Sequence, residues 1–159
     1  MNSDQIGFRI LKKSRRNPEP GDIFCFQLNQ TNDRYFFGRV VAADTKIGGI
    51  EGLNVILIYI YKKTSMDNNS IPTLEVSDLL VPPIGTNARP WVSGYFETVG
   101  SVKNKASDLL CKHSFRDVRG LYFDEYGSLS STPSEPIGEY GVSGVSGIYL
   151  KIKKALDSP

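Results

Sequence analysis

Runs of apolar residues separated by polar turns follow one another through the N-terminal half of the chain. In the run at 23–28 every second residue is large and apolar, which predicts a strand. A polar turn at 29–33 leads to an aromatic and β-branched run at 34–43, so the two runs predict an antiparallel hairpin with a loop of about five residues. The run at 53–61 is continuously apolar and predicts a central strand buried on both faces.

The segments that follow have weaker patterns. Residues 71–80 fit an edge strand followed by a loop and also one helical turn, and both interpretations stay open. The aromatic residues of 91–99, after Pro90, predict a strand, and a further strand is expected at 119–123. Residues 103–115 fit a short helix or an irregular loop.

The C-terminal tail repeats apolar residues at helical spacing over 145–156. Three lysines fall late in this segment, where cations favour the end of a helix. The alternation of Ile148, Leu150 and Ile152 would also suit a strand. We predict a terminal helix.

Composition agrees with short strands joined by tight turns. The chain has 159 residues with 40% hydrophobic residues, 15 glycines, 9 prolines, 8 Tyr, 8 Phe and one Trp. Aromatic side chains suit pleated surfaces, while Gly and Pro suit turns. We predict a mainly β fold of the α+β kind, with a strongly twisted antiparallel sheet or a small barrel-like core and a C-terminal helix. Without an internal repeat or long linker, residues 1–159 are expected to form a single domain.

Charge is distributed unevenly around a net value of +2. Residues 1–17 are predicted to form a basic N-terminal strand or arm, either a solvated terminus or a segment that contacts a partner. Its cations are Arg9, Lys12, Lys13, Arg15 and Arg16. The Gly, Ser and Pro-rich segment 124–147 is acidic, with Asp124, Glu125, Glu135 and Glu139 and no Lys or Arg.

Candidate catalytic chemistry is sparse. The two cysteines, Cys25 and Cys111, are expected to be reduced and partly buried, and Cys111 lies two residues before the single histidine, His113. Nothing in the sequence lowers the pKa of that thiol, so we expect a structural cysteine near a surface histidine. No metal motif, phosphate-binding loop or cofactor motif is present, and we expect a protein without catalytic residues, metal or cofactor.

The termini suggest a location. Residues 1–10 lack an apolar core followed by a cleavage site, and no stretch approaches the roughly 18 apolar residues that a membrane span needs. We therefore expect a cytoplasmic protein that makes no contact with a membrane.

Two stretches resemble a known family, the immunity protein 26 family. The first is Pro20-Gly21-Asp22-Ile23-Phe24 leading to Tyr35-Phe36-Phe37-Gly38-Arg39-Val40-Val41, and the second is Leu80-Val81-Pro82-Pro83-Ile84 leading to Arg89-Pro90-Trp91 and Gly94-Tyr95-Phe96. The resemblance covers roughly residues 18–100. It implies an immunity protein, encoded beside a toxin of a bacterial polymorphic or contact-dependent growth inhibition system, that protects the cell by binding the toxin domain.

The resemblance also implies which residues are not expected to contact the toxin. Immunity interfaces diversify with the toxin, so the residues that carry the resemblance are expected to be scaffold. They are Gly21, Asp22, Phe24, Gly38, Arg39, Pro82, Pro83, Trp91, Gly94 and Phe96.

Three functional hypotheses follow. In the first, Asp124, Glu125, Glu135 and Glu139 dock on a cationic toxin surface, that of a nuclease, although the same acids could form a solvated loop. In the second, a nucleic-acid-binding barrel uses the basic arm and exposed aromatics such as Tyr35 or Tyr59, but this leaves the acidic segment unexplained and makes nucleic acid the weaker partner. The third, an enzyme built around Cys111 and His113, has the least support.

Overall fold

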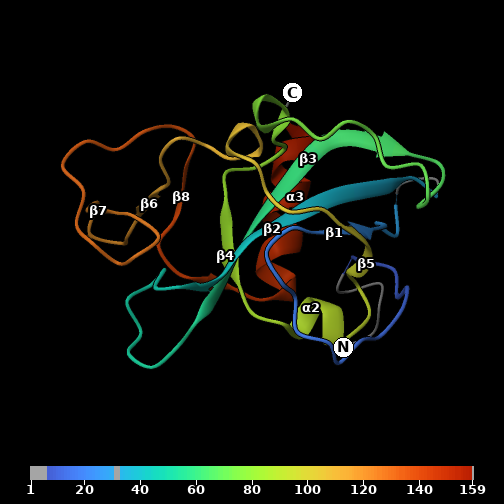
Figure 1. Cartoon of the computed structure of the whole chain (residues 1–159), viewed down its shortest axis with the longest axis horizontal. Coiled ribbons are helices and arrows are strands. Elements are labelled where there is room, and N and C mark those ends of the chain that lie inside the picture. Colours follow the sequence, from blue (N-terminus) through green and yellow to red (C-terminus); the bar gives the residue numbers. More distant parts are fainter. Residues whose placement is uncertain (1–6, 31–32, 159) are drawn as a thin grey trace.

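The computed structural model describes residues 7–30 and 33–158, and its strands form two sheets (Figure 1). The larger has six strands in the order β5-β1-β2-β3-β4-β9, and the smaller has three in the order β7-β6-β8. The strands are β1 (Asp22–Phe26), β2 (Tyr35–Thr45), β3 (Val55–Ser65), β4 (Ile84–Thr86), β5 (Glu97–Ser101), β6 (Ser114–Arg116), β7 (Tyr122–Phe123), β8 (Ile137–Glu139) and β9 (Val142–Ser143). The predicted mainly β fold with a twisted sheet is confirmed, and the sheet does not close into a barrel.

The three long central strands form as their sequence pattern predicts. β1 and β2 pair antiparallel in the expected hairpin, and β2 pairs antiparallel with β3. Every residue of β3 from Val55 to Tyr61 is buried. Ile56, Ile58 and Ile60 pack into one hydrophobic cluster, while the alternate residues, Tyr59 among them, pack into a second cluster on the opposite face. A continuous apolar run is required because both faces of this central strand are covered.

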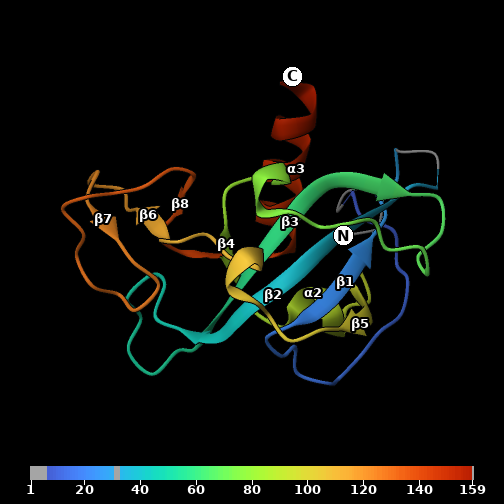
Figure 2. The ribbon, with the colours of Figure 1, turned by 45° about the horizontal axis from the view of Figure 1, so that its top comes forward.

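The C-terminal helix α3 (Val145–Asp157) covers the first of these faces (Figures 1 and 2). Its Ile148 and Ile152 are fully buried in the same cluster as Phe24, Trp91 and Phe96. The helical prediction for this tail is confirmed, because spacing of four residues places both isoleucines on one side of a helix.

The basic N-terminal segment lies against the sheet over its described part. Phe8 forms a β-bridge with Leu28, and the backbone N–H of Leu11 donates to the carbonyl of Gly94. Phe8 is buried and packs edge-on against Phe26. One aromatic side chain thus holds a segment whose charges alone would favour solvent. Residues 1–6 of the predicted arm lie outside the described residues.

The strand predicted over 91–99 is wrong in its first half. Trp91 lies in the short helix α2 (Arg89–Val92), and the strand β5 begins only at Glu97. Pro90 sits in the first turn of α2, where its fixed φ and missing N–H are tolerated. Gly94, with φ of 85°, turns the chain out of the helix and towards β5.

The ambiguous segments resolve into short elements. A 3₁₀ turn, η1 (Val76–Asp78), lies in the segment 71–80, and a second, η2 (Ala106–Asp108), precedes β6. The strand predicted over 119–123 is only the two-residue β7, because the chain turns at Gly120 with φ of 86°. In the described part of the chain, no helix is both long and apolar enough to span a bilayer.

Candidate partner-binding surface

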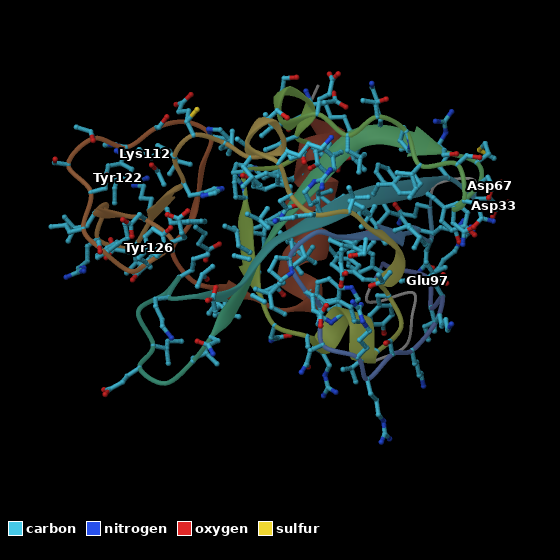
Figure 3. All side chains as sticks on the ribbon, viewed as in Figure 1. Asp33, Asp67, Glu97, Lys112, Tyr122 and Tyr126 are labelled. Atoms are coloured by element: carbon cyan, nitrogen blue, oxygen red, sulfur yellow. The ribbon has the colours of Figure 1, made fainter. Side chains whose placement is uncertain are left out.

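The small sheet and its loops project beyond one edge of the larger sheet (Figure 1). We call residues 111–140 the lobe. Figure 3 places Lys112, Tyr122 and Tyr126 here, at the opposite end of the molecule from Asp33 and Asp67. Among the described residues, four of the thirteen large exposed apolar side chains fall within the twelve residues 118–129 of the lobe, namely Val118 (104% exposed), Leu121 (40%), Tyr126 (74%) and Leu129 (67%). Exposed apolar side chains that gather into one patch mark protein interaction sites.

No functional hypothesis was drawn from these four apolar residues, because polar residues separate them in the sequence. Isolated apolar residues in a loop are ordinarily unremarkable, and their exposure here depends on the lobe standing away from the larger sheet. The available signal was their density over 118–129, a stretch for which the sequence predicts only a short strand at 119–123.

A polar network joins the lobe to the larger sheet. The ring nitrogen Nε2 of His113 lies 2.5 Å from the hydroxyl of Tyr59, and Nδ1 pairs with the carboxylate of Glu125. The backbone N–H of Leu110 donates to the same hydroxyl over 3.0 Å. The imidazole of His113 thus bridges the Glu125 carboxylate and the Tyr59 hydroxyl, and that hydroxyl also accepts from Leu110. The network therefore ties β3 to β6 and to the turn that follows β7.

Burial and charge act on this network together. Burial raises the pKa of the Tyr59 hydroxyl to about 12, so the phenol is neutral at ordinary pH. Burial also acts to raise the pKa of Glu125, but the hydrogen bond and charge of His113 act in the opposite direction, and the pKa lies below its ordinary value. Glu125 is therefore ionised at neutral pH and held by His113.

Close backbone packing forms a second contact between the lobe and the larger sheet. Gly138 on β8 lies so near the Pro83 carbonyl that an added Cβ would be 2.3 Å from its oxygen. The backbone N–H of Lys46, after β2, donates to the carbonyl of Glu125 over 2.8 Å. These contacts place the lobe directly beside the β2–β3 loop and the start of β4.

The four acids predicted to contact a toxin all lie in the lobe but in different settings. Asp124 accepts hydrogen bonds from the N–H groups of the turn after it, and Glu125 is bound to His113. Glu139 is exposed and forms an ion pair of 2.8 Å with Lys151 of α3. Glu135 is exposed and has no ion pair within the described residues. Their role in binding stays a prediction.

A groove of about 860 Å³ lies where the lobe meets α3 and the loop before β4. No local sequence pattern predicts this groove, because three segments far apart in the chain form its walls. One wall carries Lys151, Lys154 and Ala155 of α3, and another carries Arg116 and Val118 of the lobe. The apolar floor consists of Leu80, Val81, Pro82, Pro83, Ile84 and Ile137.

Most residues that carry the resemblance are buried in the larger sheet. Phe24, Trp91 and Phe96 pack ring against ring, with Phe24 and Phe96 stacked at 4.5 Å. Asp22 is fully buried and paired with Arg16 at 2.9 Å. Arg39 is 6% exposed and donates to the Tyr61 hydroxyl and to Asn104. The exception is Pro82, which is exposed and lines the groove.

The environments of Cys111 and His113 differ from the expectation, whereas Cys25 is a free, buried thiol as expected. His113 is 6% exposed, and Cys111 is exposed, so the expected surface histidine and structural cysteine are both wrong. The ring of His113 is occupied by Tyr59 and Glu125 rather than by a thiol. Cys25 is buried, which raises the pKa of its thiol to about 12. In the described ranges, no group of three or more His, Cys, Asp or Glu could hold a metal ion.

The second hypothesis loses one of its proposed contacts. Tyr59 is fully buried, so its expected exposure to a nucleic acid is wrong. Two of the arm's cations are also engaged within the protein, Arg9 with Asp33 and Arg16 with Asp22. Lys12, Lys13 and Arg15 stay exposed, but Tyr59 is not available for stacking on a base.

Comparison with known proteins identifies the family. A search of curated proteins and a search of solved structures give no match. A family model described as Immunity protein 26 matches residues 19–119, which is more than half of the chain. The matched segment contains β1 to β6 and ends where the rest of the lobe begins. The chain belongs to the immunity protein 26 family.

Proposed function

We propose that this chain neutralises a toxin by binding it without catalysis, and that the lobe is the surface in contact with the toxin. Membership of an immunity protein family implies a toxin partner and a non-enzymatic role. The observation that carries the choice of surface is the concentration of exposed apolar side chains at 118–129. Interfaces are commonly centred on such residues, Tyr in particular, and rimmed by polar groups.

The acids of the lobe set the charge of the proposed partner. Two of the cations in this region are already engaged, because Lys112 donates to the Thr132 hydroxyl at 2.6 Å and Arg119 pairs with Asp117 at 2.8 Å. Asp124 and Glu135 have no ion pair within the described residues, and together with Glu139, which is paired with Lys151, they give the lobe an acidic rim. We propose a cationic toxin, and specifically a nuclease, since a nuclease must itself attract phosphate.

The extent of the family match supports the same surface. The match ends at residue 119, while three of the four exposed apolar residues and all of the predicted acids follow it. An interface that differs between toxins would fall outside the shared scaffold. We therefore propose that the toxin specificity of this chain resides in residues 120–140, in the cytoplasm of a cell that carries a polymorphic or contact-dependent inhibition system.

A variant in which neutral residues replace three acids tests whether the toxin binds at the lobe. The triple variant Asp124→Asn, Glu135→Gln and Glu139→Gln should bind the toxin encoded beside this gene about tenfold more weakly at low salt, with a flatter salt dependence. Asp67→Asn is the matched control, because Asp67 also accepts a backbone N–H in an exposed turn but lies at the far end of the molecule (Figure 3). Affinity would be measured by calorimetry over a salt series. Unchanged affinity and salt dependence in the triple variant would show that the toxin binds elsewhere.

The proposed contribution of the apolar side chains has its own test. Tyr126→Ala should weaken binding by about 2 kcal/mol or more if this exposed ring is an anchor of the interface. Met66→Ala is the control, since Met66 is 64% exposed in a loop outside the lobe. If the wild-type protein neither binds nor inhibits the toxin, the proposed function itself is wrong.

A further inference from the structure

We infer that the groove between the lobe and α3 binds a peptide segment that carries a carboxylate beside an apolar side chain. This inference rests on the proposed function, because that function supplies a protein partner. The groove contacts both the family-matched part of the chain, at residues 80–84, and the unmatched C-terminal part. It is thus placed to extend an interface centred on the lobe.

The floor of the groove calls for an apolar occupant. It is formed by the aliphatic and proline side chains that precede and begin β4, together with Ile137 of β8. Val118 stands at one side and is completely exposed. A volume of about 860 Å³ accommodates several side chains, and burying an apolar group there removes apolar surface from water on both partners.

The charges around the groove call for an anion. Of the five charged residues that line it, Glu139 is paired with Lys151 at 2.8 Å and Asp117 is paired with Arg119 at 2.8 Å. The remaining two are cations, Arg116 and Lys154, and neither has an ion pair within the described ranges. A carboxylate that enters from solvent therefore meets two unpaired cations and no unpaired acid.

The position of Lys154 beside the groove follows from the geometry of the helix. Lys154 and Ala155 follow Lys151 by three and four residues, so all three lie on one face at the C-terminal end of α3. Ile148 and Ile152 occupy the face beside it and are buried against the sheet. Packing of the isoleucines thus fixes which lysines face the groove, and Lys153 is not among the groove residues.

A peptide titration tests the groove directly, without the toxin. The probe is a capped octapeptide with leucines on both sides of a single glutamate, and its counterpart has lysine in place of the glutamate. In nitrogen-15 NMR spectra of the full chain, the glutamate peptide should shift the amides of Val118, Gly138 and Lys154. Its affinity should exceed that of the lysine peptide by about tenfold. Equal affinities, or no shifts in these residues at millimolar peptide, would overturn the inference.

Variants separate the groove from the rest of the surface. The double variant Arg116→Glu and Lys154→Glu should abolish the preference for the glutamate peptide, and Val118→Asp should weaken its binding. Lys153→Glu is the matched control on the adjacent, exposed position of the same helix and should bind like the wild type. Retention of the preference in the double variant would also refute the inference.

The toxin then distinguishes the two proposals. If the toxin binds the wild type and the double groove variant equally well, the proposed function stands and the groove inference is wrong. If the groove takes up the glutamate peptide as expected but the neighbouring toxin does not bind the wild type, the proposed function is wrong and the peptide site remains.

Discussion

Gly38 lies on β2 with the ring of Phe24 packed directly against its Cα position. A Cβ added there would be 2.2 Å from Cζ of Phe24 and 2.6 Å from the carbonyl oxygen of Tyr59. Both atoms belong to the packed interior, where neither the ring nor the backbone can move without displacing its neighbours. Gly38, one of the residues that carry the family resemblance, is thus required because no side chain fits at this position.

Gly38→Ala should lower the free energy of unfolding by about 3 kcal/mol through overpacking. Gly100→Ala is the control on another strand of the same sheet, because its added Cβ meets only the end of the Ile71 side chain at 3.6 Å. That change should stay within about 0.5 kcal/mol. Urea unfolding of the two variants checks the difference, and equal losses would contradict the packing argument.

Glu125 shows how one carboxylate can hold two parts of the fold together. Its side chain is 18% exposed and bound to His113, which in turn meets Tyr59 of the larger sheet. The pKa of Glu125 is lower in the folded protein than in the unfolded chain, so its stabilising effect is present above the ordinary glutamate pKa. This stabilisation is lost as the pH falls through the lowered folded-state pKa.

Glu125→Gln should therefore cost about 2 kcal/mol at neutral pH, and the difference from the wild type should shrink below about pH 4. Glu75→Gln, at an exposed residue without an ion pair, should behave like the wild type throughout. Urea unfolding measured at several pH values gives both curves. A constant difference between wild type and Glu125→Gln from neutral to acid pH would argue against an ionised Glu125 held by His113.

At the scale of elements, α3 shows that a helix outside the family match can complete the core. Its Ile148 and Ile152 fill the same cluster as the aromatic residues of β1 and the segment after α2. Regular spacing made this helix predictable from the sequence. The short helix α2 was not predictable in the same way, because aromatic residues around Trp91 suit a strand until Pro90 and Gly94 are considered together.

Ile152→Ala in α3 should cost about 3 kcal/mol, since it leaves a cavity between the helix and the sheet. Leu150→Ala removes a side chain that is 62% exposed and should change stability by less than about 0.5 kcal/mol. Thermal and urea unfolding provide the comparison. Similar values for the two variants would mean that α3 contributes little to the folded core.

At the scale of the whole molecule, the two sheets are joined by polar contacts and by close backbone packing. The network from Tyr59 to Glu125 and the approach of Gly138 to Pro83 connect them at separate points. We therefore propose that the chain unfolds as one cooperative unit, in agreement with the single domain expected from its length.

Two probes in different parts of the fold test this cooperativity. Trp91 of α2 is buried in the core cluster that covers the larger sheet and reports through its fluorescence. A dye on Cys111 reports from the start of the lobe, because that thiol is exposed whereas Cys25 is buried with its pKa raised to about 12. Both signals should give the same urea midpoint. An earlier transition of the Cys111 dye would show that the lobe unfolds by itself.

The sequence by itself determined the elements whose pattern is local. The runs at 23–28, 34–43 and 53–61 predicted β1, β2 and β3, and helical spacing predicted α3, because period two and period 3.6 leave direct marks on the order of apolar residues. The family resemblance likewise rested on consecutive residues. The sequence also determined how many acids lie in 124–147, but not which residues surround each of them in space.

Only the tertiary structure decided how distant segments meet. It joined Tyr59, His113 and Glu125 into one network, and it formed the groove from the loop before β4, the lobe and α3. Four acids that are equivalent in the sequence thereby acquired different settings, from the half-buried Glu125 bound to His113 to Glu135, which has no ion pair in the described part of the chain. Charge and hydrophobicity are properties of residues, whereas exposure and pairing depend on contacts between segments that no local pattern encodes.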